Sequence, residues 1–147
     1  MKKFKFRFEK ILGFRRHCEM EKQRDLADVL HRRQKQQNAI EAICEDRSGQ
    51  QASQRELMTG VIQPSRLNGF TRYYLVLNLM ESSGRAVLQK ISGEVDKKRE
   101  SLLEATREKK IYEKLKERHW GKYSTEVNLL MQKEMDDIGQ KLYWLKK

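Results

Sequence analysis

The segment TGVIQPSRLNG, residues 59–69, contains Pro64, which is the one proline of the 147 residues. Proline and glycine both disfavour the interior of a helix, so this cluster marks a turn. On either side of it run long stretches without proline that are rich in residues favouring helices. The sequence therefore predicts two very long helices joined by one turn.

The apolar residues on both sides of the turn recur at steps of three and four. We expect a helix over about residues 4–58, a turn over about 59–67 and a helix over about 68–145, forming a single α-helical hairpin. Apolar residues that fit one face are Phe4, Phe8, Ile11, Leu12, Leu26, Leu30, Ile40 and Cys44 before the turn, and Phe70, Tyr73, Leu77, Met80, Val87, Ile91, Val95, Leu102, Ala105, Tyr112 and Leu115 after it. This spacing indicates an all-α fold, an antiparallel two-helix coiled coil. Between Arg15 and Asp25 apolar residues are few, and long polar side chains should cover the seam there.

The start of the chain admits a second interpretation. Phe4, Phe6 and Phe8 alternate with Lys5 and Arg7 at period two, which is the pattern of a strand or an extended arm. A helix with frayed first residues is the preferred interpretation, and the extended arm stays open.

The second helix is expected to overhang the first. Folding about Pro64 pairs residue i with roughly residue 128 minus i, so Phe8 should face Trp120, and about 20 residues at the C-terminus lack a partner. These last residues still carry an apolar stripe, which consists of Val127, Met131, Met135, Ile138, Leu142 and Leu145. Such a stripe predicts binding to another protein, although a tail that frays in isolation and folds on binding is also consistent with it.

Composition supports a long exposed helix and not a two-layer enzyme. Charged residues make up 36% of the chain and aromatic residues 8%. The net charge is +11, and an excess of basic residues at the N-terminus should favour an anionic surface. Beyond that end, basic and acidic residues are interleaved and no nucleic-acid-binding motif accompanies them, so nucleic acid is not an expected partner.

No residues in the sequence form a recognisable catalytic, cofactor-binding or metal-binding set. His17, His31 and His119 do not fall at the spacing that places two metal ligands on one helix face, and Asp136 and Asp137 are neighbours that diverge around a helix. The sequence contains no glycine-rich phosphate loop and no nucleophile motif. We therefore expect no enzyme activity and no cofactor. The lack of a secretion signal and of an apolar membrane span predicts a cytoplasmic protein.

Four segments together resemble a known family. They are FKFRFEKIL at residues 4–12, FTRYYLVLNL at 70–79, EKLKER at 113–118, and KEMDDIG at 133–139, which follows Tyr123 and Glu126. Their order and spacing resemble those of the flagellar export protein FliJ family, whose first helix begins F-x-F-x-L-E-x-L-L. Phe8 stands where that pattern usually has leucine. The injectisome counterpart of this family has the same shape, so the sequence distinguishes the flagellar system from the injectisome only through these motifs.

The resemblance implies a small cytoplasmic part of the flagellar type III export apparatus, similar to the central stalk of rotary ATPases. The paired terminal end of such a protein inserts into the ring of the export ATPase and promotes its hexamer and its activity. The hairpin end faces the export gate in the membrane, and the family also handles export chaperones. Through these partners the protein would lie at the cytoplasmic face of the inner membrane, at the flagellar base.

Two sets of binding residues follow from the resemblance and the apolar pattern. The set expected to bind the ATPase is Phe4, Phe8, Ile11, Leu12, Arg15, Met131, Ile138, Leu142 and Leu145. The set expected to bind the export gate is Tyr73, Tyr74 and Leu77. The alternative function is that of a basic coiled-coil scaffold, or a nucleic-acid-binding protein, unrelated to secretion.

Overall fold

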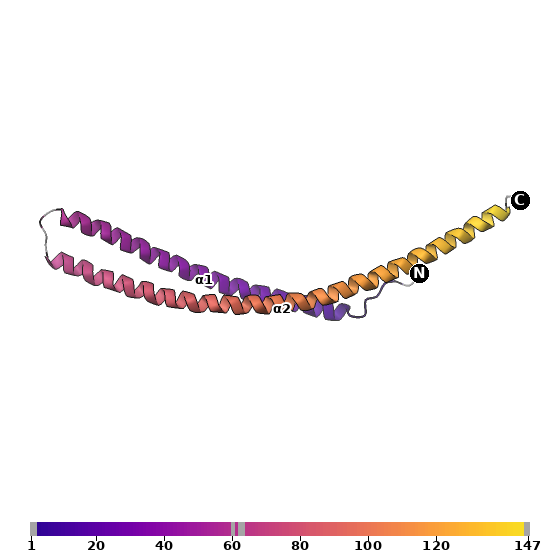
Figure 1. Cartoon of the computed structure of the whole chain (residues 1–147), viewed down its shortest axis with the longest axis horizontal. Coiled ribbons are helices and arrows are strands. Elements are labelled where there is room, and N and C mark those ends of the chain that lie inside the picture. Colours follow the sequence, from indigo (N-terminus) through magenta and orange to yellow (C-terminus); the bar gives the residue numbers. More distant parts are fainter. Residues whose placement is uncertain (1–2, 60, 62–63, 146–147) are drawn as a thin grey trace. The chain divides into compact units, whose positions relative to one another are not determined.

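The chain folds as two long α-helices packed antiparallel in a hairpin (Figure 1). The computed structural model describes residues 3–59, 61 and 64–145, with side chains up to Trp144. Helix α1 runs over Glu9–Met58 and has 50 residues, and helix α2 runs over Pro64–Leu145 and has 82. The predicted fold class, an all-α hairpin with a longer second helix, is confirmed.

Contacts within the chain group its residues into two compact units. Unit 1 comprises Met1–Glu21 and Leu103–Lys147, and unit 2 comprises Lys22–Leu102. Each unit therefore contains a stretch of α1 and a stretch of α2. Unit 2 includes the turn, and unit 1 includes both ends of the chain.

Helix α1 begins later than the sequence predicted. Residues 3–6 have no regular secondary structure, residues 7 and 8 form a turn, and the helix starts at Glu9 instead of Phe4. The arm that we define as residues 3–8 follows the period-two pattern, because its alternate phenylalanines pack on α2 while the residues between them face solvent. A helix through Phe4, Phe6 and Phe8 would direct these rings to different faces. Glu9 then suits the first turn, where its charge complements the helix dipole.

Helix α2 begins earlier than predicted, at Pro64 instead of about residue 68. The first turn of a helix has backbone N–H groups without intrahelical partners, so a proline there loses nothing and its fixed φ suits the helix. Pro64 is therefore the first residue of α2.

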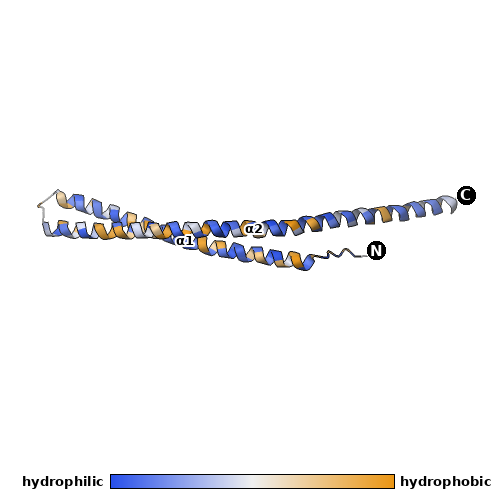
Figure 2. Cartoon of the chain, turned by 60° about the horizontal axis from the view of Figure 1, so that its bottom comes forward, coloured by the Kyte–Doolittle hydropathy of each residue, from blue (hydrophilic) through white to orange (hydrophobic). Residues whose placement is uncertain are grey.

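The seam of unit 2 contains residues that are not apolar, and the prediction from apolar spacing did not include them. Its buried apolar side chains are those of Val29, Ile40, Leu77 and Val95. Glu81 and Gly84 are also buried, whereas Tyr73, Met80 and Val87, predicted to lie in the seam, are exposed. In Figure 2, hydrophobic residues (orange) are interspersed among hydrophilic ones (blue) along both helices.

The pairing of the two helices differs from the predicted pairing by about one helical turn. Phe4 contacts Trp120, and Ile40 lies beside Gly84, so the paired residue numbers sum to 124 in both cases. The predicted pairing of Phe8 with Trp120 is wrong, since the Phe8 ring instead lies near Tyr112. The shift arises because α1 ends at Met58 and α2 already begins at Pro64, so the chain turns ahead of Pro64 and not at it.

Gly84 allows a close approach of the two helices. A Cβ atom at this position would lie 3.2 Å from Ile40 Cγ1 and 3.2 Å from Gln36 Nε2. The Gln36 side chain uses the same space, because its Nε2 donates a hydrogen bond of 3.2 Å to the Gly84 carbonyl. At Gly93, by contrast, a Cβ would meet no atom within 4 Å.

The two glycines predict opposite effects of one substitution. Gly84→Leu should lower the free energy of unfolding by about 1–3 kcal/mol, because the added side chain overpacks the seam. Gly93→Leu should raise it by about 0.5–1 kcal/mol, since leucine favours a helix more than glycine does and the site is open. Urea unfolding followed by circular dichroism measures both values. A stabilising Gly84→Leu variant would contradict the close approach.

Candidate partner-binding surfaces

Unit 1 contains a cluster of aromatic rings that fixes the N-terminal arm on α2. We define the aromatic cluster as Phe4, Phe6, Phe8, Tyr112, His119, Trp120 and Tyr123. The Phe4 ring lies 5.1 Å from Trp120 and 5.5 Å from Tyr123 between centroids. The Phe6 ring lies 5.7 Å from that of His119, and Phe6 is buried. Edge-to-face pairs of this kind add to the stability gained by burying the rings. The arm is therefore an integral part of unit 1.

A groove of about 640 Å³ lies next to this cluster in unit 1. Its wall combines apolar and charged side chains, namely Phe4, Leu12, Arg16, Glu113, Lys116, Glu117 and Trp120. Two ion pairs border it, one between Arg16 Nη2 and Glu113 Oε1 at 3.4 Å and the other between Lys116 Nζ and Glu9 Oε2 at 2.7 Å. The groove thus presents both signs of charge around an apolar floor, which suits a protein segment.

Long polar side chains cover the seam of unit 1 where apolar residues are few, as predicted. Lys109 Nζ lies 2.7 Å from Glu19 Oε2, and the Thr106 hydroxyl donates a hydrogen bond of 2.9 Å to Glu19 Oε1. Glu19 is buried. The hydrogen bond from Lys109 lowers the pKa of Glu19, with a further contribution from Thr106, while burial opposes the shift.

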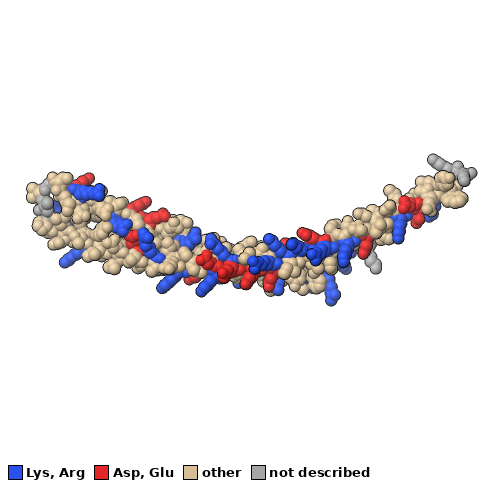
Figure 3. Space-filling model, viewed as in Figure 1, with Lys and Arg blue, Asp and Glu red and all other residues tan. Residues whose placement is uncertain are grey.

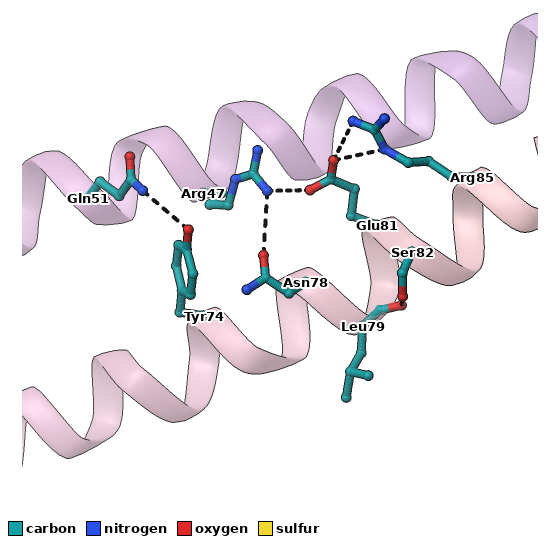
Figure 4. Close-up of polar contacts among 8 residues, drawn as sticks. All are labelled: Arg47, Gln51, Tyr74, Asn78, Leu79, Glu81, Ser82 and Arg85. Carbon is teal, nitrogen blue, oxygen red and sulfur yellow. Dashed lines mark hydrogen bonds and ion pairs between the residues drawn. The ribbon is translucent and has the colours of Figure 1, made fainter.

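Unit 2 has two further carboxylates held in the ionised form by basic partners. Lys98 donates a hydrogen bond of 2.7 Å to Asp25, and this contact lowers the pKa of Asp25. Glu81 accepts hydrogen bonds from Arg85 and Arg47, of which the first contributes most to its lowered pKa (Figure 4). Arg47 and Asp25 belong to α1, so both sites connect the two helices.

These lowered pKa values predict an acid-sensitive hairpin. A carboxylate whose pKa is lower in the folded state stabilises the fold above its unfolded pKa of about 4, and that contribution is lost as the pH falls through the folded value. The urea concentration at the midpoint of unfolding should therefore decrease as the pH is lowered from about 5 to about 2. Glu81→Gln should remove part of this dependence, whereas Glu104→Gln, at an exposed residue, serves as the matched control. An identical pH profile for Glu81→Gln and the native chain would contradict the assignment.

Of the N-terminal residues expected to bind the ATPase, some are engaged within the hairpin and others are at least partly exposed. Leu12 is 0% exposed and belongs to the core of unit 1, so it supports the surface from beneath. Arg15 is bound to Glu108 across the seam, with 2.6 Å between Nη1 and Oε2. Phe4 and Phe8 are half-buried in the aromatic cluster, and Ile11 is exposed. Sequence reasoning missed Phe14 and Trp120, which are both exposed and large.

The C-terminal part of α2, which we call the tail (residues 128–145), has an exposed apolar surface. Met131, Ile138 and Leu142 of the predicted set are all exposed, and so is Met135. The last predicted residue, Leu145, lies outside the residues whose side chains are described. Leu129, Leu130 and Trp144 add exposed apolar area that the predicted stripe did not include.

The residues expected to bind the export gate are mostly engaged within unit 2. Leu77 is 4% exposed and lies in the seam. The Tyr73 hydroxyl donates a hydrogen bond of 2.5 Å to Asp46, which raises the pKa of Tyr73. The Tyr74 hydroxyl accepts a hydrogen bond of 3.4 Å from Gln51 (Figure 4). The neighbouring exposed residues, which sequence reasoning missed as a surface, are Leu75, Val76, Leu79 and Met80.

The charged side chains are interleaved along the molecule, as Figure 3 shows on one face. Over residues 3–59, 61 and 64–145, no group of three or more His, Cys, Asp or Glu residues is placed to hold a metal ion. Within the same ranges, neither helix is long and apolar enough to cross a membrane.

One family model matches the chain over nearly its whole length. Residues 4–147 match the family model described as flagellar FliJ protein. The searches of curated proteins and of solved structures gave no match. Because the family match extends over nearly the whole sequence, the chain belongs to the flagellar FliJ protein family, the members of which are stalk-like, generally non-enzymatic components of the flagellar export apparatus.

Proposed function

We propose that the chain is a non-enzymatic stalk that binds the hexameric ring of the flagellar export ATPase through unit 1. In this function it promotes the ATPase hexamer and its activity, and it links the ring to the membrane export gate and to export chaperones. The protein then acts at the cytoplasmic face of the inner membrane through its partners. The observation that carries the proposal is the exposed apolar surface of the tail, which belongs to the same unit as the basic arm.

The proposed ATPase-binding surface consists of exposed members of the predicted set, together with Phe14 and the basic residues of the arm. The tail contributes Met131, Ile138 and Leu142, which are large, apolar and exposed. Ile11 and Phe14 are exposed on the first turns of α1, and Lys3, Lys5 and Arg7 are exposed on the arm. Apolar anchors surrounded by charges are typical of the centre and rim of a protein interface.

The proposed gate-binding surface shifts from the predicted residues to their neighbours in unit 2. Leu77 stabilises the hairpin from the seam, and Tyr73 and Tyr74 are tied to α1 by hydrogen bonds. Leu75, Val76, Leu79 and Met80 are exposed on the same turns of α2, and they supply an apolar surface for the gate protein. Tyr73 is itself 42% exposed and borders this surface.

The basic arm provides a direct test of ATPase binding. Reversing the charges of Lys3, Lys5 and Arg7 to glutamate should weaken binding of the purified ATPase roughly tenfold, because attraction between the partners becomes repulsion. Arg15 and Arg16 are left unchanged, since both form ion pairs across the seam and their reversal would disturb the hairpin. Isothermal titration calorimetry measures the affinity, and circular dichroism checks the helix content.

A matched control reverses the same number of charges in unit 2. Arg24, Lys90 and Lys97 are exposed, and none of them forms an ion pair in the described part of the chain. Their reversal should leave ATPase binding within about twofold of the native affinity at moderate salt. Equal losses in the two variants would show that only net charge matters and would contradict a specific surface on unit 1.

A further inference from the structure

The tail of α2 has the pattern of a coiled-coil seam without a second helix beside it. Met131, Met135, Ile138 and Leu142 follow one another at steps of four, three and four, which are the a and d positions of a heptad repeat. Their exposed fractions lie between 46% and 71%. The pairing of the hairpin, in which Phe4 lies against Trp120, leaves no residue of α1 to cover these positions. This seam is the surface that the inference concerns.

Two charged residues of opposite sign flank the seam on one side. Met135 and Leu142 occupy a positions of the heptad, because each follows the preceding apolar residue by four. Glu134 and Lys141 directly precede them and therefore occupy g positions. Both side chains are exposed. Neither of them takes part in an ion pair among the residues that the structure describes. In a coiled coil the g residues select the partner and its orientation.

The positions of these charges are complementary to those of a second copy in the antiparallel orientation. When two tails cross with Met135 of one copy opposite Ile138 of the other, Met131 lies opposite Leu142, and every apolar position meets an apolar position. In antiparallel coiled coils g residues face g residues, so Glu134 of each copy meets Lys141 of the other. The contact is two-fold symmetric, and each ion pair therefore forms twice.

A parallel pair of tails has a less favourable charge pattern. There the g residue faces the e residue of the next heptad in the other copy. Glu134 would face Gly139, and Lys141 would face position 146, which is also a lysine in the sequence. The parallel arrangement thus gains no ion pair and brings like charges together.

We propose that two copies of this chain associate through their tails as a short antiparallel coiled coil, with Glu134 of each copy paired with Lys141 of the other. The association buries Met131, Met135, Ile138 and Leu142 of both copies. If the proposed function holds, the dimer and the ATPase-bound chain exclude each other, because they use the same surface. The dimer then keeps the apolar tail covered until the ATPase is present.

Sedimentation equilibrium of the full chain alone tests this association without any ATPase. The native chain should change from monomer to dimer over concentrations on the order of micromolar. Lys141→Glu and Glu134→Lys should each weaken the dimer roughly tenfold, since each converts two attractive pairs into repulsive ones. The double variant with both substitutions should restore the native dissociation constant. Lys133→Glu and Asp136→Lys make the same charge changes away from the seam and should leave it within about twofold.

Three results would overturn the proposal. The first is a native chain that remains monomeric at all concentrations up to the millimolar range. The second is a stronger dimer in Lys141→Glu, because that variant relieves the repulsion of the parallel arrangement. The third is a failure of the double variant to restore association. All variants change exposed residues, and circular dichroism confirms that each remains helical.

Discussion

Leu12→Ala should lower the free energy of unfolding of the hairpin by about 2–5 kcal/mol. Leu12 is fully buried in unit 1, beside Phe4 and Trp120 in the wall of the groove. Removing its side chain leaves a cavity beneath the arm, and a helix fixed by its own hydrogen bonds cannot close that cavity completely. Urea unfolding followed by circular dichroism gives the free-energy change, and tryptophan fluorescence, to which Trp120 and Trp144 both contribute, is a second probe of the transition.

Leu79→Ala is the matched control for this experiment. The same atoms are removed, but Leu79 is 70% exposed, so the free energy of unfolding should change by no more than about 0.5 kcal/mol. Equal effects of the two substitutions would contradict the position of Leu12 in the core. Leu12 would then have to be considered again as a direct contact to a partner.

Substituting Ile138 and Leu142 together with aspartate should weaken binding of the export ATPase by roughly 100-fold or more. This estimate follows from two large apolar side chains, each of which contributes about 1.5–3 kcal/mol when fully buried at the proposed interface. Both residues are exposed in the chain alone, so the hairpin should keep its thermal stability. Surface plasmon resonance with immobilised ATPase gives the dissociation constants.

The corresponding control substitutes Leu75 and Leu79 with aspartate on the proposed gate-binding surface. It introduces the same charges at two exposed leucines of unit 2, and ATPase affinity should remain within about twofold. Binding to the cytoplasmic part of the gate protein should be lost instead. A tail variant that binds the ATPase normally would remove the tail from the interface.

The sequence predicts the hairpin well because its strongest signals are local. The single proline cluster marks the turn, and steps of three and four mark the two helices. The start of α1 was predicted less well, since Phe4, Phe6 and Phe8 fit both a helix and an extended arm. The choice between them depends on contacts with Trp120 and His119 that are more than 110 residues away in the chain.

The details of the seam could not be predicted from apolar residues alone. Glu19 and Glu81 are buried because Lys109, Arg47 and Arg85 neutralise them, and no local pattern shows which charges will meet across the hairpin. Gly84 is buried because two helices approach closely there. The pairing itself is shifted by about one turn from the predicted one, because the chain turns ahead of Pro64.

For the candidate surfaces, the sequence identified segments better than individual residues. The stripe of the tail was predicted to lack a partner within the hairpin, and its members Met131, Met135, Ile138 and Leu142 are exposed. Leu12 and Leu77 were predicted to bind partners, but both lie in the seam. The residue type alone does not show whether an apolar side chain on a coiled coil lies in the seam or on a surface that binds a partner. Only the orientation of its side chain, which depends on the pairing of the helices, separates the two.

Steady-state ATP hydrolysis by the flagellar export ATPase, measured with and without this protein and together with the size of the ATPase complex, tests the central proposal most directly. The stalk function predicts a higher rate of hydrolysis in parallel with hexamer formation, and it predicts that the variant with aspartate at Ile138 and Leu142 produces neither effect. An ATPase whose activity and size are unchanged by the native chain would contradict the proposed function.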